Sequence, residues 1–409
     1  MKSTLWTKNF TIITLGTIIS AIGDVAMSFT FSFIIYDQSQ STFLSGLFSA
    51  FMMVPKAILP LIAAPMIDRF PKKIFIVGLD GLAAGIYLLV GVYFLAMPFH
   101  FLFYFIFALV MSCIGSIYQL AYQSLYPKLI PEGFSQKGYT VSGMIYPTVM
   151  IVMNPVAAFL YQKLGMGFIT ICTGGLLLTA CLLETQIVIT EQVALKNEID
   201  SPWKQYLQDA KAALIYLKKE KGLQKIYTYI PITQGISMGT SVLLIAWFRT
   251  NPNLQIEMYS FFTMVEFIGR SIGGFVNYRI PIPANKRFSI AYFVYQIYSV
   301  MDGILLFLPY PFMLINRAIC GFLGINSATL RESSVQNYIP DSMRAKINSL
   351  FSILITISTM FFQLLVGAVG EVVSAPICML MFSALNIFFC WVIVYRGKES
   401  IKAIYNHVY

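Results

Sequence analysis

Long runs of apolar residues, each about long enough to cross a membrane, follow one another along the whole chain. A spanning helix needs about 20 mostly apolar residues, because lipid offers no hydrogen-bond partner to an exposed backbone N–H or C=O. The runs are continuously apolar rather than alternating, which argues against a transmembrane β-barrel. The pattern predicts an all-α integral membrane protein with twelve spans, at residues 10–36, 42–67, 74–96, 99–123, 139–162, 166–190, 223–248, 255–277, 287–308, 310–332, 346–370 and 374–396.

Composition and charge support a membrane protein and predict its orientation. The chain is 57% hydrophobic and 11% charged, whereas a soluble globular chain carries about 25% charged residues. Nearly all of the 28 Lys and Arg residues fall in alternate connecting segments, and basic residues of short loops stay on the cytoplasmic side. We therefore expect both termini to be cytoplasmic, in a cell (plasma) membrane of the bacterial inner-membrane type. The net charge of +10 is then a topology signal with attraction to anionic membrane lipids, and no nucleic-acid partner is expected.

An internal repeat divides the chain into two halves. Ile130-Pro131-Glu132 and Ile339-Pro340-Asp341 lie 209 residues apart, and the same offset carries Ala64-x-x-x-Asp68 onto Gly273-x-x-x-Asn277. Two matches at one offset predict a duplicated six-helix unit. We expect the halves at residues 1–192 and 223–409, joined by a cytoplasmic linker at 193–222.

The linker itself has a helical pattern of apolar residues. These residues recur at spacings of three and four, and they are Trp203, Leu207, Ala210, Leu214 and Leu217. The spacing predicts an amphipathic helix that lies on the inner membrane surface. A solvated linker without membrane contact is the alternative.

Charge is concentrated between the second and third spans, in the stretch APMIDRFPKKIFIVGLDG that begins at Ala64. Twelve spans in two halves with such a loop resemble the major facilitator superfamily, and the resemblance covers the whole chain. The signature loop of that family reads Gly-x-x-x-Asp-Arg-x-Gly-Arg-Arg, and its positions are held here by Ala64, Asp68, Arg69, Pro71, Lys72 and Lys73. The sequence SLYPKLIPEG after the fourth span is similar to the macrolide-efflux type of exporter in this family.

The resemblance implies a gating role for this loop. Asp68 would meet the N-terminus of span 11, which follows Pro340, and would hold the cytoplasmic side shut while the cavity faces outward. Arg69, Lys72 and Lys73 would anchor the loop among lipid headgroups and neighbouring carboxylates, although both lysines are also compatible with a topology signal alone. Asn277 is the counterpart of Asp68 in the second half.

Several ionisable residues fall inside the predicted spans, where a charge is expensive and faces a cavity or a partner. Asp24 lies midway along span 1, and the resemblance implies that spans 1, 4, 7 and 10 line the cavity. It is therefore a candidate for proton coupling. Glu266 is the rival candidate, although it is four residues before Arg270 and the two can form a static pair. For Lys56, snorkelling, pairing with a carboxylate and contact with an anionic substrate all remain open.

Other charged and polar residues complete the picture. Asp80 and Asp302 lie nearer helix ends in spans 3 and 9, which the resemblance makes peripheral, and we interpret both as structural. The polar and aromatic residues of the cavity-lining spans are candidates for substrate contact, together with many Met and Phe residues that suit amphiphiles. The candidates are Asp24, Tyr118, Gln119, Tyr122, Gln234, Ser237, Asn316, Arg317 and Asn326.

The sequence shows no nucleotide-binding loop, no metal-ligand spacing and no acyl-transfer triad, so we expect neither an enzyme nor a cofactor or metal. The reading favoured by these observations is a monomeric secondary active transporter. It would be a proton-coupled efflux antiporter that carries amphiphilic small molecules by alternating access, with protons as the coupling ion. One alternative is a transporter dedicated to a single substrate, such as a siderophore, lipid or peptide. The other is a receptor with a transport fold but no turnover.

Overall fold

The computed structural model describes residues 4–132, 134–189, 202–279 and 282–407, and these parts of the chain contain helices and no strands. They divide into two compact units. Unit 1 comprises residues 1–39 and 51–203, and unit 2 comprises residues 40–50 and 204–409. The helices of unit 1 are α1 (Lys8–Ser39), α3 (Val54–Arg69), α4 (Lys72–Ala96), α5 (Phe101–Leu129) and α6 (Ser135–Glu184).

Unit 2 holds the remaining helices, including the short α2 that precedes α3 in the chain. They are α2 (Thr42–Phe51), α7 (Pro202–Lys219), α8 (Lys221–Thr250), α9 (Ile256–Arg279), α10 (Arg287–Ile304), α11 (Tyr310–Tyr338), α12 (Asp341–Gly370), α13 (Ala375–Phe389) and α14 (Lys398–Tyr405). Short 3-10 turns at Ala284–Lys286 and Leu305–Phe307 and a π-helical stretch at Cys390–Tyr395 adjoin them.

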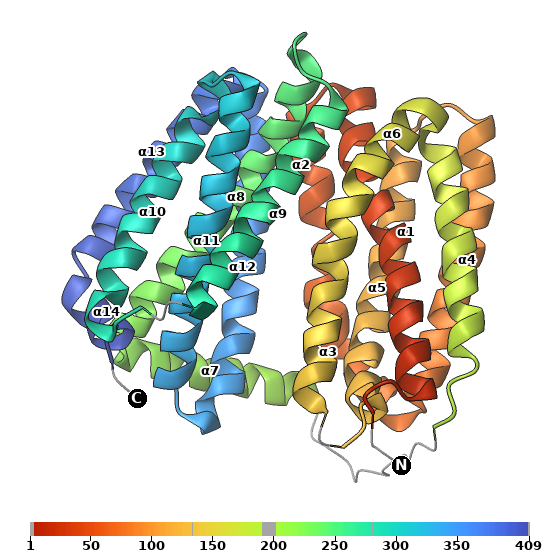
Figure 1. The fold of residues 1–409 in the computed structure, drawn as a ribbon, viewed down its shortest axis with the longest axis horizontal. Coiled ribbons are helices and arrows are strands. Elements are labelled where there is room, and N and C mark those ends of the chain that lie inside the picture. Colours follow the sequence, from red (N-terminus) through yellow and green to blue (C-terminus); the bar gives the residue numbers. More distant parts are fainter. Residues whose placement is uncertain (1–3, 133, 190–201, 280–281, 408–409) are drawn as a thin grey trace. The chain divides into compact units, whose positions relative to one another are not determined.

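The helices account for the twelve predicted spans. Within the described residues, ten helical segments are long and apolar enough to cross a membrane. One of these segments, α6, covers two predicted spans, because the chain turns back at Gly165 and its second part descends beside α4 (Figure 1). The twelfth span is α9, which is less apolar because it carries Glu266 and Arg270. The all-α fold of two six-helix halves predicted from the apolar runs is confirmed.

The turn within α6 depends on glycine. Gly165 has φ 75° and ψ 179°, a backbone region that side chains with a Cβ essentially do not adopt. Space is not the constraint, because a Cβ built at Gly165 would meet no atom within 4 Å. Glycine is therefore needed for its backbone conformation.

The predicted duplication is visible in the ends of matching helices. α5 begins at Phe101 and α11 at Tyr310, and the two helices end at Leu129 and Tyr338. Both pairs of ends are separated by the predicted offset of 209. Each helix is followed by an extended isoleucine and a proline, which suits a helix end because the residue before proline avoids the helical region.

Close helix packing in both units relies on small residues. In unit 1, a Cβ at Gly23 of α1 would approach Thr173 Cγ2 of α6 to 2.9 Å. In unit 2, a Cβ at Gly321 of α11 would collide with the backbone oxygen of Glu266 on α9. Without a hydrophobic driving force between helices in lipid, such close backbone approach supplies much of the packing energy.

α7 forms where the sequence predicts an amphipathic helix, but its buried face differs from the predicted stripe. Ala213 and Leu217 are buried in a core cluster of unit 2, whereas Leu214, which belonged to the stripe, is 47% exposed. An ion pair of 2.9 Å between Asp209 Oδ1 and Lys346 Nζ fixes α7 to α12. Residues 193–201 and the side chains of Trp203 and Leu207 lie outside the described residues. The placement of α7 on the membrane surface stays a prediction.

Glu371, directly after α12, caps the N-terminus of α2. Its Oε1 accepts hydrogen bonds from the Phe43 backbone N–H at 2.8 Å, from Ser41 Oγ at 2.6 Å and from Thr42 Oγ1 at 3.2 Å. The unpaired N–H groups at a helix N-terminus favour an anion. Partial burial alone would raise the pKa of Glu371, but the hydrogen bonds together outweigh it and lower the pKa below the ordinary value of 4.5.

Replacing Glu371 with Gln should loosen this cap. A hydrogen bond to a charged acceptor contributes more than one to a neutral acceptor, so amide exchange at Phe43 should accelerate by about threefold or more at neutral pH. Because the folded-state pKa is lowered, the contribution of the cap is present above the ordinary pKa and is lost as the pH falls through the lowered one. Hydrogen–deuterium exchange read by mass spectrometry measures the effect.

Glu399→Gln is a suitable control, because Glu399 lies in the first turn of α14 and its loss should leave the exchange of α2 unchanged. Equal exchange at Phe43 in wild type and Glu371→Gln would show that the carboxylate does not stabilise α2.

Candidate functional site

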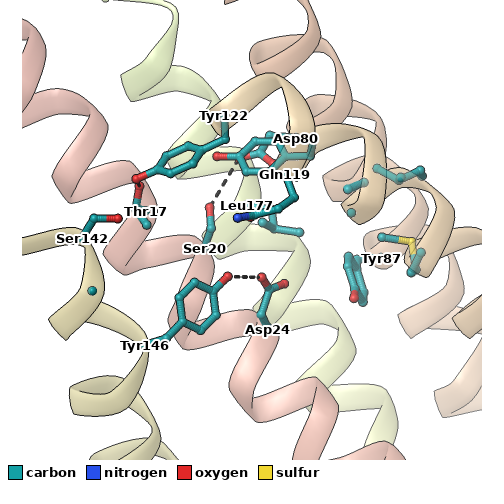
Figure 2. Close-up of a pocket in the computed structure, with 16 residues that line it drawn as sticks. Thr17, Ser20, Asp24, Asp80, Tyr87, Gln119, Tyr122, Ser142, Tyr146 and Leu177 are labelled. Carbon is teal, nitrogen blue, oxygen red and sulfur yellow. Dashed lines mark hydrogen bonds between the residues drawn. The ribbon is translucent and has the colours of Figure 1, made fainter. Parts of the chain in front are cut away.

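A cavity of about 340 Å³ lies within unit 1, among α1, α4, α5 and α6 (Figure 2). Its walls combine aromatic rings, hydroxyl groups and two carboxyl groups. The lining residues are Thr17, Ser20, Asp24, Asp80, Ala83, Tyr87, Met111, Ile114, Gly115, Tyr118, Gln119, Tyr122, Ser142, Gly143, Tyr146 and Leu177. Its size is that of a small-molecule site.

α1 presents its polar face to this cavity. Thr17, Ser20 and Asp24 follow one another at spacings of three and four, which places them on one side of a helix. Asp24 is exposed, and its Oδ2 accepts a hydrogen bond of 2.9 Å from the Tyr146 hydroxyl of α6 (Figure 2). Lys56 of α3, itself exposed, attracts the Asp24 carboxylate electrostatically although it does not line the cavity.

α5 supplies another wall by the same spacing. Gly115, Tyr118, Gln119 and Tyr122 recur at three and four residues and line the cavity. Thr17 Oγ1 donates a hydrogen bond of 3.2 Å to the Tyr122 hydroxyl. The rings of Tyr118 and Tyr122 are stacked, with centroids 6.2 Å apart. This wall therefore offers flat apolar surfaces with phenolic oxygens at their edges.

Besides Asp24, two carboxyl groups lie in or beside the wall of this cavity. Asp80 of α4 is 5% exposed, and its Oδ2 accepts a hydrogen bond of 3.4 Å from Ser20 Oγ (Figure 2). Glu184, the last residue of α6, is fully buried, and its Oε1 accepts a hydrogen bond of 3.2 Å from the Tyr118 hydroxyl. Its Oε2 has no hydrogen-bond partner. Among the residues described as lining the cavity, the charged ones are Asp24 and Asp80, and none is Lys or Arg.

The structure brings together some of the sequence-predicted cavity residues and not others. Asp24, Tyr118, Gln119 and Tyr122 meet at the cavity of unit 1. The other candidates belong to α8 and α11 of unit 2 and do not line it, namely Gln234, Ser237, Asn316, Arg317 and Asn326. Their part in a substrate site stays a prediction.

Arg317 has a local partner in unit 2. Its guanidinium forms an ion pair with Asp302 of α10, and it lies 5.4 Å from the ring centroid of Phe262. Asn316 beside it donates a hydrogen bond of 2.9 Å to the Met301 backbone oxygen. This pairing agrees with a structural role for Asp302 and leaves the Arg317 charge compensated.

The sequence pattern predicts a structural role for Asp80 and does not single out Glu184. The structure places Asp80 in the cavity wall and Glu184 in contact with Tyr118, which belongs to that wall. One signal was present in the sequence, because Glu184 is an isolated acid in the apolar run LLLTACLLETQIVIT. A carboxyl group at such a position is a candidate functional residue by default.

Glu266 and Arg270 form the pair that their spacing predicts. Arg270 Nη2 lies 2.8 Å from Glu266 Oε1, and Arg270 Nε donates to the same oxygen at 3.2 Å. The Arg270 side chain is 43% exposed. Both belong to α9, so Glu266 has a compensating charge on its own helix.

The gating loop is described only in part. The side chains of Asp68, Arg69 and Asp341 lie outside the described residues, so the predicted contact of Asp68 with the start of α12 stays a prediction. Lys73 Nζ donates hydrogen bonds of 2.7 Å to the backbone oxygens of Thr185 and Ile187. These partners are carbonyl groups after the end of α6, and the predicted contact of this lysine with headgroups and carboxylates stays a prediction. Lys72 is buried, and Asn277 lies in the last turn of α9.

One comparison with known proteins identifies a family, and another shows a similar fold. The family model described as Major Facilitator Superfamily matches residues 13–301. No curated protein matches the chain by sequence. Among solved structures, the nucleoside transporter NupG is similar with a TM-score of 0.70 and 12% identity, over 96% of this chain and 100% of that chain. A POT family transporter in complex with 5-aminolevulinic acid is similar with a TM-score of 0.71 and 10% identity, over 96% of each chain.

Proposed function

The chain belongs to the major facilitator superfamily of membrane transporters, and from that premise we propose that it exports cationic, amphiphilic small molecules in exchange for protons. The observation that supports this most is the accessible carboxylate of Asp24 in a cavity whose described lining residues include no Lys or Arg. The mechanism would be alternating access of the cavity to the two sides of the membrane.

The lining suits both the positive charge and the apolar groups of an organic cation. The carboxylate of Asp24 would pair with the positive charge, and the neighbouring Asp80 adds to the negative potential. The rings of Tyr87, Tyr118 and Tyr146 would contact the apolar groups of the substrate and attract its charge through their π-faces. Few directed hydrogen bonds are needed for such a ligand, which fits a transporter that accepts several related amphiphiles.

The same carboxylate supplies a reason for exchange with protons. Asp24 can carry a proton or pair with a cation, but a protonated carboxyl group loses the charge that holds the cation. Binding of the two is therefore mutually exclusive, and each must leave before the other can bind. With protons more concentrated outside the cell, this competition moves protons inward and the cation outward. Efflux follows from the competition and the direction of the gradient.

A pair of ions that share one shape tests the charge preference. Tetraphenylphosphonium and tetraphenylborate are nearly identical in size, but the first is a cation and the second an anion. We expect the purified protein to bind tetraphenylphosphonium and to bind it more weakly as the pH falls, because protons compete for Asp24. Equilibrium dialysis measures both affinities. Equal binding of the two ions, or preference for the borate, would contradict the proposal, as would binding that does not depend on pH.

Whereas protons are expected to weaken binding of tetraphenylphosphonium, the substitution Lys56→Gln is expected to strengthen it. Lys56 attracts the Asp24 carboxylate, and removal of its charge should tighten binding of tetraphenylphosphonium.

Competition by nucleosides or peptides against tetraphenylphosphonium would instead favour a transporter with a dedicated substrate.

A further inference from the structure

Asp80 and Glu184 form a pair of carboxyl groups that the proposed exchange at Asp24 does not use. Asp80 comes from α4 and Glu184 from the end of α6, and they are 5% and 0% exposed. Glu184 acts electrostatically on Asp80. We propose that the pair is a second proton-binding site, which holds one proton that is released when a cation binds at Asp24. The claim that the proton is released rests on the proposed function, whereas the claim that the pair holds a proton does not.

The surroundings of the pair do not compensate two negative charges. The groups that act on it are Asp24 from α1, Ser20 from α1, Tyr118 from α5 and Cys181 from α6. None of these four residues, all of which the structure describes, is basic. Lys73 is near the end of α6, but its ammonium donates hydrogen bonds to the backbone oxygens of Thr185 and Ile187. Two ionised carboxylates in one apolar site repel each other strongly, so the pair retains a proton.

The unpaired oxygen of Glu184 supports this assignment independently. Glu184 Oε2 is buried without a hydrogen-bond partner, whereas Oε1 accepts from the Tyr118 hydroxyl. If Glu184 were ionised, a negatively charged oxygen would be buried without a hydrogen-bond donor. The ionised state is therefore less favourable here than the protonated state. A proton at this carboxyl group removes that charge.

The chain also makes room for the Glu184 side chain. A Cβ at Gly16 of α1 would lie 3.0 Å from Glu184 Oε1 and 3.3 Å from its Cγ. On the other side, Cys181 Sγ donates a hydrogen bond of 3.3 Å to the Val77 backbone oxygen and fixes α6 against α4. The carboxyl group is therefore enclosed by α1, α4 and α5 packed around the end of α6.

Two hydroxyl groups connect the pair to the cavity. Ser20, one turn from Asp24 on α1, donates to Asp80, and Tyr118, which lines the cavity, donates to Glu184. A cation in the cavity lies beside both Asp24 and Asp80, because both residues line it. Its positive charge therefore favours the ionised form of Asp80 as well as that of Asp24. The O–H bond of the carboxyl group then breaks, its electron pair stays on the carboxylate, and the proton passes through these hydroxyls to water in the cavity. Binding of one cation would thus release two protons.

Proton counting tests the release. Purified protein in weakly buffered detergent solution is mixed with tetraphenylphosphonium, and a pH-sensitive dye reports the protons released per cation bound. We expect about two protons for the wild type and about one for Glu184→Gln and for Asp80→Asn. Asp37→Asn is the matched control, because Asp37 is also on α1 and also accepts a hydrogen bond from a tyrosine, Tyr161, and it should release two.

An infrared measurement tests the bound proton without any substrate. The wild type at neutral pH should show carbonyl absorption of protonated carboxyl groups, and part of it should be lost in Glu184→Gln and kept in Asp37→Asn. Release of one proton by the wild type, with unchanged counts in both variants, would overturn the second site while leaving the exchange at Asp24 intact. Absence of the absorption would overturn it as well. Failure of the wild type to bind tetraphenylphosphonium would instead count against the proposed function.

Discussion

Replacing Asp24 with Asn should abolish proton-driven transport of tetraphenylphosphonium and leave the protein folded. Asn can still accept the hydrogen bond from Tyr146 and has almost the same shape, so the packing of α1 should be kept. The variant loses both the negative charge and the titratable group. Because two opposite unit charges about 6–10 Å apart attract by roughly 1.7–2.8 kcal/mol at the effective dielectric constant of a protein, binding should weaken by roughly 10- to 100-fold. Uptake into inverted vesicles under an imposed pH gradient should fall to the level of empty vesicles.

Two other carboxyl variants make this result specific. Asp37→Asn removes an acid from the same helix outside the cavity, and it should transport at the wild-type rate. Glu266→Gln removes the rival candidate on α9, whose charge is already compensated by Arg270, and it should retain most of the driven transport. Full driven transport by Asp24→Asn together with its loss in Glu266→Gln would move the coupling site to α9.

Asp302→Asn should be the most destabilising of the substitutions considered for unit 2. The Arg317 side chain is 5% exposed, and its Nε has no hydrogen-bond partner, so Asp302 is its compensating charge. Removing one member of a buried ion pair leaves the other charge uncompensated, which destabilises proteins by about 3–5 kcal/mol. The midpoint of unfolding in a titration with denaturing detergent should shift accordingly.

A second substitution should reverse much of this loss. Asp302→Asn combined with Arg317→Met removes both charges and keeps a long apolar side chain in place of arginine, so no buried charge remains. Glu266→Gln is the matched control, because it breaks an ion pair whose arginine is 43% exposed, and such pairs contribute about 0–1 kcal/mol. If Asp302→Asn were as mild as Glu266→Gln, or if the double variant were the least stable, the pair would not stabilise unit 2.

The sequence by itself determined the number of spans and the twofold repeat. Lipid requires long apolar helices with internally paired backbones, so composition alone marks where the chain crosses. The repeat was visible because the helix ends keep their chemistry, as Ile130-Pro131 and Ile339-Pro340 show. Asp24 was also recognisable, since a lone carboxylate midway along an apolar run is too expensive to be incidental.

Only the tertiary structure decided which charged residues meet. Tyr146 reaches Asp24 across 122 positions of the chain, and Cys181, three residues before Glu184, reaches Val77 of α4 across 104 positions. Arg317 is predicted to line the cavity from its span alone, and only the structure shows that Asp302 on α10 compensates its charge. In a soluble protein, an alternation of polar and apolar residues tells which side of a helix faces inward. Lipid and the protein interior are both apolar, so this alternation is weak in a membrane helix. The contacts of each side chain are therefore known only from the packing of the helices.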